Sequence, residues 1–158
     1  MPGHAAPDPL QLDFVPEGAS RAHIITIRLR RALEEDIRRV LAAHSTLTIP
    51  EWRILSVLYQ GKGAQAQKDI IAHTRIAQGQ ASRALFAMQN RGLLEAAQST
   101  KDRRAWSYRL SAEGRALFEA LIPQMRERQR RLDGAVSEQE LAQFQDIAAR
   151  IARATNEG

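Results

Sequence analysis

Four side chains near the middle of the chain have the chemistry needed to read the edges of DNA bases. Gln78, Gln80, Ser82 and Arg83 follow one another within one short segment. A glutamine amide suits adenine, a guanidinium suits guanine, and a serine hydroxyl is permissive. Acting together, they would need one element that presents all of them at one surface. The alternative is that they form the polar outer side of an ordinary helical hairpin.

The elements that would position these side chains are two short helices joined by a tight turn. The sequence predicts helices over about 67–73 and 78–91, with a turn over 74–77 between them. Gly92 suits the position just past the second helix. In a helix-turn-helix motif the first residues of the second helix enter the major groove of DNA. The four polar residues fall in that part of the predicted helix.

A β-hairpin is predicted directly after these helices. Residues 93–97 and 106–110 are short segments on either side of a polar tip over 98–104. In the second segment the large side chains of Trp106 and Tyr108 alternate with smaller or polar residues, as in a strand with one buried face.

Capping patterns mark the starts of three other helices. Thr48 and Glu51 form a capping box, and so do Ser137 and Glu140. Ser111 is expected to cap the helix that follows the hairpin.

Two long helical segments carry apolar stripes but little core of their own. In residues 20–44 the stripe recurs at i+4 and consists of Ile25, Leu29, Leu33, Ile37 and Leu41. Residues 112–155 carry a similar stripe, and Pro123 is expected to kink or restart the first helix there. Such stripes must be buried against each other or against another chain, and twofold dimers are the commonest solution.

These elements predict a mainly α fold with a small β-hairpin, arranged in three parts. Residues 1–19 hold four of the six prolines and are expected to form a flexible tail. Residues 48–110 are expected to form a compact lobe. Residues 20–47 and 111–158 are expected to form a helical dimerisation region.

The composition favours a polyanionic partner and no membrane part. The net charge is +5, and the basic residues are nearly all Arg, with Lys only at 62, 68 and 101. A basic surface suits nucleic acid or anionic lipid, although Arg-rich composition also arises in GC-rich genomes. No segment approaches the ~20 apolar residues of a membrane span, and no signal pattern opens the sequence. We expect a cytoplasmic protein.

Enzymatic and metal-binding patterns are missing from the sequence. The four histidines, His4, His23, His44 and His73, are far apart and lack ligand spacing. There is no glycine-rich phosphate loop and no nucleophile elbow. The absence of cysteine excludes disulfides, thiolate metal sites and thiol-based redox sensing. We expect no catalytic residues, no metal and no cofactor.

Several segments, in their order and spacing, resemble the MarR family of winged helix-turn-helix regulators. They are Thr48-Ile-Pro-Glu-Trp-Arg-Ile-Leu55, Asn90-Arg-Gly-Leu-Leu94, Ser99-Thr-Lys-Asp-Arg-Arg104 and Ala105-Trp-Ser-Tyr-Arg-Leu-Ser-Ala-Glu-Gly114. The resemblance covers about residues 22–155. It implies a winged helix-turn-helix lobe on a helical dimerisation region. It also implies a transcriptional regulator, usually a repressor, that binds a pseudo-palindromic operator in double-stranded DNA as a homodimer.

The resemblance also implies roles for residues of the hairpin tip, which is the wing of this family. Asp102 resembles the aspartate that holds the tip in shape, and Arg104 the arginine that enters the minor groove. Arg103 is the neighbouring candidate for a phosphate contact. The alternative for both arginines is a merely solvated loop. Ser82 and Arg83 match positions where relatives often carry Ser or Thr and Arg. The segment Gln78-Gly79-Gln80 departs from the family pattern, and its glycine is expected to loosen the first turn.

An effector site is implied between the dimerisation helices and the lobe, where this family binds small, mostly anionic aromatic molecules. Here Arg21, Arg28, His44 and Trp52 are the expected contacts. His44 has the plainer alternative of a surface residue bonded to backbone.

Two other functions compete with DNA-binding regulation. One is a winged-helix module for protein–protein interaction without a DNA role, and the other is a helical small-molecule-binding protein. Arg83 and Arg104 favour DNA, because a protein-binding module needs no basic wing.

Overall fold

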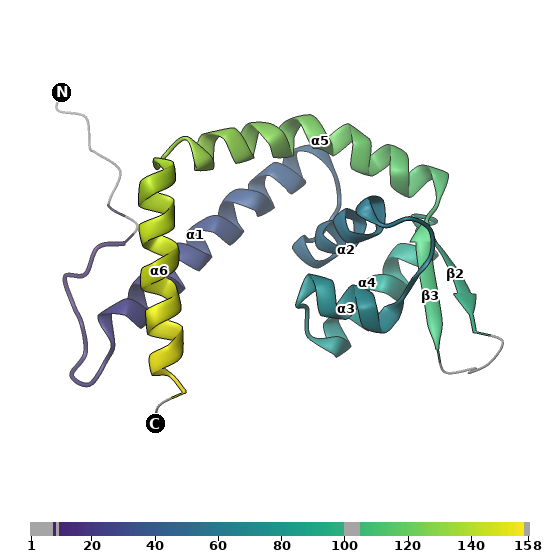
Figure 1. The fold of residues 1–158 in the computed structure, drawn as a ribbon. Helices are drawn as coiled ribbons and strands as arrows, with labels where there is room; N and C mark the ends of the chain where they lie inside the picture. Colours follow the sequence, from purple (N-terminus) through teal and green to yellow (C-terminus); the bar gives the residue numbers. More distant parts are fainter. Residues whose placement is uncertain (1–7, 9, 100–104, 157–158) are drawn as a thin grey trace. The chain divides into compact units, whose positions relative to one another are not determined.

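The computed structural model describes residues 8, 10–99 and 105–156, and its fold is mainly helical with one small sheet (Figure 1). In chain order the elements are α1 (Arg21–His44), α2 (Ile49–Gln60), β1 (Gln65–Ala66), α3 (Gln67–Thr74), α4 (Gln78–Asn90), β2 (Leu94–Gln98), β3 (Trp106–Leu110), α5 (Ala112–Asp133) and α6 (Glu138–Ala154). The predicted fold class is confirmed. None of the helices in these residues combines the length and apolarity that a membrane span requires.

The chain divides into two compact units. The helical unit comprises Met1–Ile37 and Glu127–Gly158, and the central unit comprises Arg38–Arg126. The predicted lobe, residues 48–110, falls inside the central unit. The assignment of dimerisation to the flanking segments stays a prediction. The predicted tail falls partly on residues 1–7 and 9, outside the described residues, and residues 10–19 contain no helix or strand.

The predicted caps are present. The Thr48 hydroxyl accepts from the Glu51 N–H at 3.4 Å, while the Glu51 carboxylate accepts from the Thr48 N–H at 2.8 Å. The box of Ser137 and Glu140 has the same reciprocal bonds, of 3.2 and 2.7 Å. The Ser111 hydroxyl accepts from the N–H of residue 114 at 3.0 Å at the start of α5. Local sequence therefore fixes where these helices begin.

Of the expected kink or restart at Pro123, the restart does not occur, because α5 continues through Pro123 to Asp133. Proline removes the hydrogen bond to the carbonyl of Glu119. Both residues are exposed, so water can satisfy that carbonyl.

The sheet has three antiparallel strands in the order β1-β3-β2. Leu94 pairs with Leu110 in the predicted hairpin. On its other side β3 pairs with β1, where Gln65 lies opposite Tyr108. The sequence analysis missed β1, because two residues are too short to show a strand period.

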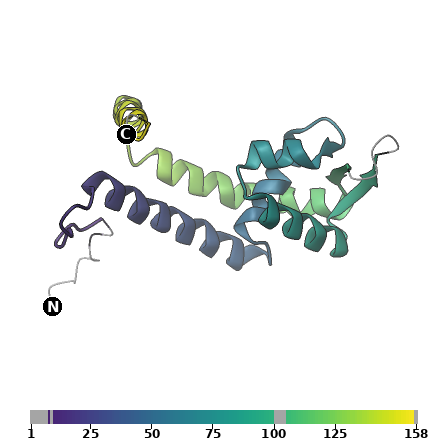
Figure 2. The ribbon, with the colours of Figure 1, turned by 90° about the horizontal axis from the view of Figure 1, so that it is seen from below.

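The central unit has its own hydrophobic core. Its buried apolar residues are Leu41, Leu47, Ile54, Leu55, Leu58, Ile70, Ile76, Ala81, Leu85, Met88, Leu93, Leu94, Tyr108, Phe118 and Leu121. Within this unit α2 contacts α3 and α4, and the β2–β3 hairpin lies beside α4 (Figures 1 and 2). The core therefore fixes the helix-turn-helix pair and the hairpin relative to one another.

The helical unit is joined by ion pairs. The Asp36 carboxylate of α1 accepts from Arg128 at 2.8 Å and from Arg131 at 2.5 Å, both on α5. Arg128 also donates to the Leu33 carbonyl at 3.3 Å. In its described residues this unit contains no buried side chain.

Candidate nucleic-acid interface

A turn of three residues, 75–77, joins α3 to α4, one residue shorter than the predicted turn over 74–77. Arg75 ends α3 in the left-handed region, at φ 54° and ψ 27°, and its N–H donates to the Ile71 carbonyl at 3.0 Å. The next residue, Ile76, is buried and anchors the turn in the core. The left-handed turn lets α4 leave α3 at an angle while its apolar side stays packed.

The buried and exposed sides of α4 separate clearly. Ala81, Leu85 and Met88 are fully buried. Of the four predicted base-reading residues, Gln78, Gln80 and Arg83 are exposed, and Ser82 is half-buried. A Cβ built on Gly79 would lie 3.6 Å from an Arg83 guanidinium nitrogen, so the Arg83 side chain runs back along the first turn. No side chain caps this helix, because its N-cap residue is Ala77.

Ser82 belongs to a hydrogen-bonded chain that sequence reasoning missed. The Gln67 amide nitrogen of α3 donates to the Ser82 hydroxyl at 2.9 Å. The Tyr108 hydroxyl of β3 donates to the Gln67 amide oxygen at 3.5 Å. Burial raises the pKa of Tyr108, so its hydroxyl keeps its proton at ordinary pH. No short-range sequence pattern could reveal these partners, because Gln67 lies 15 residues before Ser82.

A second set of polar contacts fixes the C-terminal end of α4. Glu51 is only 5% exposed, and besides its capping bond it accepts from Arg91 at 2.9 Å. Arg91 also donates to the Thr46 hydroxyl at 2.8 Å. The N–H groups of Gly92, which has φ 72°, and Leu93 bond back to the last turn of α4, which confirms the predicted glycine stop. Both ends of α4 are thus tied to the rest of the central unit.

The hairpin beside α4 carries an ion pair and an exposed aromatic ring. Arg109 of β3 donates to Glu95 of β2 at 2.7 Å. Trp106, at the start of β3, is 38% exposed. Asp102, Arg103 and Arg104 lie outside the described residues, so their wing roles stay predictions.

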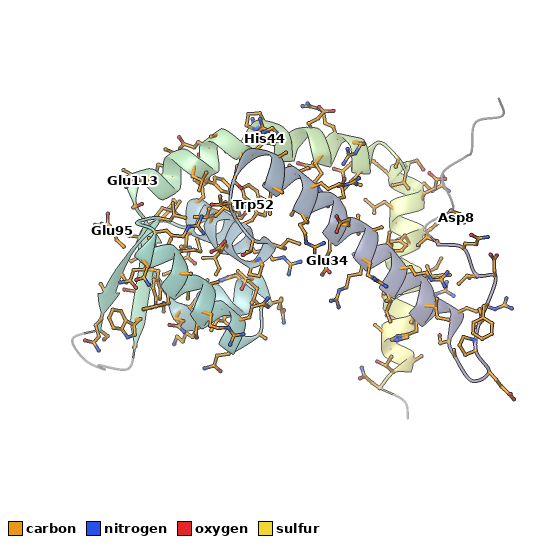
Figure 3. All side chains as sticks on the ribbon, turned by 180° about the vertical axis from the view of Figure 1, so that it is seen from behind. Asp8, Glu34, His44, Trp52, Glu95 and Glu113 are labelled. Carbon is orange, nitrogen blue, oxygen red and sulfur yellow. The ribbon has the colours of Figure 1, made fainter. Side chains whose placement is uncertain are left out.

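The four expected effector residues do not form a site within either unit. Arg21 and Arg28 belong to the helical unit, whereas His44 and Trp52 belong to the central unit. His44 is exposed at the end of α1, and Trp52 lies on α2 (Figure 3). The Trp52 ring is stacked on Phe118 at a centroid distance of 4.7 Å, so one of its faces is already covered.

The central unit also contains an open cavity of about 350 Å³. Its charged lining residues are Glu95, Arg109 and Arg115, and none of the expected effector residues lines it. Arg109 is paired with Glu95, and Arg115 lies 4.0 Å from Glu119. Paired guanidinium groups are poor anion receptors, so we assign no ligand to this cavity.

Sequence and structure comparisons both point to one family. Residues 45–105 match a family model described as MarR family. No curated protein matches the chain in sequence.

Among similar solved structures is AbsC, a MarR family transcriptional regulator from Streptomyces coelicolor, with a TM-score of 0.76 and 18% identity over 92% of this chain and 99% of AbsC. Sco3205 from the same organism, solved in complex with DNA, has a TM-score of 0.74 and 14% identity over 89% and 91% of the two chains. BpsR from Bordetella bronchiseptica, whose DNA binding is regulated by 6-hydroxynicotinic acid, has a TM-score of 0.65 and 22% identity over 81% and 98%.

These structures share the fold over 81–92% of the chain, and the family model covers α2 to β2 but ends before β3. Residues 45–105 of the chain therefore match the MarR family, and the chain has the fold of solved MarR family transcriptional regulators.

Proposed function

We propose that the protein is a cytoplasmic repressor that binds a pseudo-palindromic operator as a homodimer. The observation that carries this proposal is the exposed polar side of α4, opposite fully buried Ala81, Leu85 and Met88. That side belongs to the second helix of a helix-turn-helix motif and has a hairpin beside it. The structural similarity to Sco3205, which was solved with DNA, supports the same use of this surface.

The contacts divide between base edges and the DNA backbone. Gln78 and Gln80 suit adenine, and Arg83 suits guanine, in the major groove. Ser82 accepts from Gln67 and keeps its own proton for a DNA acceptor. In the wing we assign Arg104 to the minor groove and Arg103 to phosphate, with Asp102 shaping the tip between them.

Dimerisation would follow from the apolar side of α6. Leu141, Phe144, Ile147 and Ile151 are between 42% and 55% exposed in the single chain. They recur at helical spacing and therefore form one stripe. A second copy presenting the same stripe would bury both, and a twofold dimer would match a pseudo-palindrome.

The direct test is selection of binding sequences from a random DNA pool, followed by mobility shifts on the DNA upstream of the protein's own coding region. The expected result is an enriched inverted repeat with half-sites about 10 base pairs apart, bound by two protomers. A reporter driven by the same upstream DNA should fall when the protein is expressed. A pool with no enriched sequence would contradict DNA recognition, and a rising reporter would contradict repression.

We propose further that a small anionic aromatic molecule releases the DNA. The regulation of BpsR by 6-hydroxynicotinic acid supports this class of effector. Arg21 and Arg28 are the candidate contacts for the carboxylate, and His44 and Trp52 are the other candidate contacts. A tenfold loss of DNA affinity requires only ~1.4 kcal/mol of coupling between the two sites.

Calorimetric titration with benzoate, salicylate and 6-hydroxynicotinate tests this part, with Arg21→Ala and Arg28→Ala as variants. Binding should weaken in one of the two variants and should lower DNA affinity. Binding that leaves DNA affinity unchanged, or no binding at all, would reject such an effector while leaving DNA recognition untouched.

A further inference from the structure

Two large apolar side chains are exposed in the described part of the central unit, and both are aromatic. Phe86 is 65% exposed on α4, and Trp106 is 38% exposed on β3. The other large exposed apolar residues among those described belong to the helical unit. The central unit buries fifteen apolar residues in its core but leaves the rings of Phe86 and Trp106 exposed. Both rings lie on elements that are proposed to contact DNA.

Phe86 lies on the same outer ridge of α4 as Arg83. The two residues are three positions apart, which places them on adjacent turns of one helix side. The fully buried residues Ala81, Leu85 and Met88 occupy the opposite side. Side chains on a helix lean toward its N-terminus, so the Phe86 ring covers the turn that contains Ser82 and Arg83. Sequence analysis missed Phe86 because it considered only polar groups.

We propose that Phe86 contacts the C5-methyl group of a thymine in each half-site of the operator. This inference rests on the proposed DNA-binding function. The thymine methyl is the apolar group that the major groove offers, and phenylalanine is among the side chains that contact it. Phe86 therefore adds an apolar base contact to the polar ones proposed for Gln78, Gln80 and Arg83.

The spacing of the two contacts follows from helix geometry. Three residues advance ~4.5 Å along an α-helix. Base pairs are stacked ~3.4 Å apart. The thymine should therefore lie one or two base pairs from the guanine that Arg83 reads.

The test removes the methyl group from the DNA and the ring from the protein, separately and together. Thymines of the selected operator are replaced one at a time by deoxyuridine, and affinity is measured for the wild-type protein and for Phe86→Ala. One deoxyuridine position in each half-site should weaken wild-type binding about fourfold, and about fifteenfold when both half-sites are changed. Phe86→Ala should bind the methylated and unmethylated operators equally well, since the interaction then has no second partner.

Two controls separate this contact from other effects. Deoxyuridine at the remaining thymines should leave the affinity of both proteins unchanged. Phe86→Leu, which keeps an apolar side chain, should retain part of the methyl preference.

The possible outcomes are distinguishable. An enriched operator with no sensitive thymine, or equal sensitivity in the wild type and Phe86→Ala, would overturn the inference and leave the proposed function standing. Unchanged DNA affinity in Phe86→Ala would also overturn it, and would point to a protein partner for the ring. A random pool without any enriched sequence would overturn the proposed function and the inference together.

Discussion

The central unit and the helical unit differ in where their apolar side chains go. All fifteen buried apolar residues belong to the central unit. The described residues of the helical unit bury none and expose Phe14, Ile27, Leu33, Val136, Leu141, Phe144, Ile147 and Ile151. The central unit has a hydrophobic core within a single chain, whereas the apolar sides of the helices in the helical unit are not buried within that chain.

This difference teaches that helix formation and helix burial are separate problems. The start of α6 is fixed by a complete capping box, yet none of its residues is buried. An isolated helix of this length is marginal in water, because nucleation is costly and packing supplies most of the stability. The central unit can stabilise its own elements, and this difference supports the proposal that the helical unit is stabilised by a partner chain.

The largest effect is expected from a charge on the apolar stripe of α6. In a dimer, each Ile or Leu that becomes fully buried contributes ~1.5–3 kcal/mol, and symmetry doubles the contribution. Ile147→Asp should therefore yield a monomer or an unfolded protein at micromolar concentration, measured by light scattering. Ala142→Asp adds the same charge on the opposite side of α6 and should remain dimeric. A monomeric wild-type protein, or a dimeric Ile147→Asp variant, would contradict the proposed interface.

The next largest effect should come from Glu51, the buried carboxylate of the central unit. Glu51→Ala removes a helix cap worth ~1 kcal/mol and a charged hydrogen bond to Arg91 worth ~2 kcal/mol. We expect a loss of about 3 kcal/mol in urea unfolding at a fixed protein concentration. Glu34→Ala breaks the exposed pair with Arg30, 3.1 Å long, and should cost ~0.5 kcal/mol or less. Equal losses would show that burial does not distinguish the two ion pairs.

The sequence predicted local features better than distant contacts. The boxes of Thr48 and Ser137 could be recognised because both partners lie within one helical turn. Contacts between distant segments, such as Glu51 with Arg91 or Ser82 with Gln67, have no short-range signature. The left-handed conformation of Arg75 could not be predicted from the sequence either.

Most helices that end with a residue in the left-handed region use glycine there. In this chain the residue is Arg75, so its type did not indicate a left-handed turn. The role of the effector residues stays a prediction, for a different reason. Their side chains fall in two units, and a sequence pattern cannot relate them.

Substitution of Arg83 tests whether the exposed side of α4 recognises DNA bases. Arg83→Ala should cost ~1–3 kcal/mol at one base position of each half-site, because a bidentate contact to guanine is lost. Arg103→Ala serves as the contrast, since the loss of a phosphate contact affects all sequences alike and lowers the salt slope by about one per subunit. Affinities for single-base operator variants at several salt concentrations separate the two. A uniform loss in Arg83→Ala would make Arg83 a phosphate contact.

Substitutions of Arg75 test whether the backbone of the turn between α3 and α4 is strained. A side chain in the left-handed region costs ~1 kcal/mol or more, and glycine avoids that cost but loses more entropy on folding. Arg75→Gly should raise the free energy of unfolding by about 0.5–1 kcal/mol in urea titrations. Arg75→Ala keeps the strain and removes the charge, so it should be close to the wild type. Equal stability of the Gly and Ala variants would mean that the turn is not strained.

The smallest effect concerns the capping box of α6 and its dependence on pH. Hydrogen bonds from the backbone N–H of Ser137, and then from its hydroxyl, lower the pKa of Glu140 below its ordinary value of 4.5. A carboxyl group with a lowered pKa in the folded state stabilises that state fully above its ordinary pKa. The stabilisation is lost as the pH falls through the lowered value.

The melting temperature of the wild type should therefore fall slightly more between pH 5 and pH 3 than that of Glu140→Gln, whose amide stays uncharged throughout. Glu138→Gln is the matched control, because Glu138 also lies in the first turn but is not the N3 partner of Ser137. If the melting temperatures of the wild type and Glu140→Gln change with pH in the same way, the charge on Glu140 does not contribute to the stability of α6. A difference confined to Glu140→Gln would show that the local signal still contributes in a helix that buries nothing within its own chain.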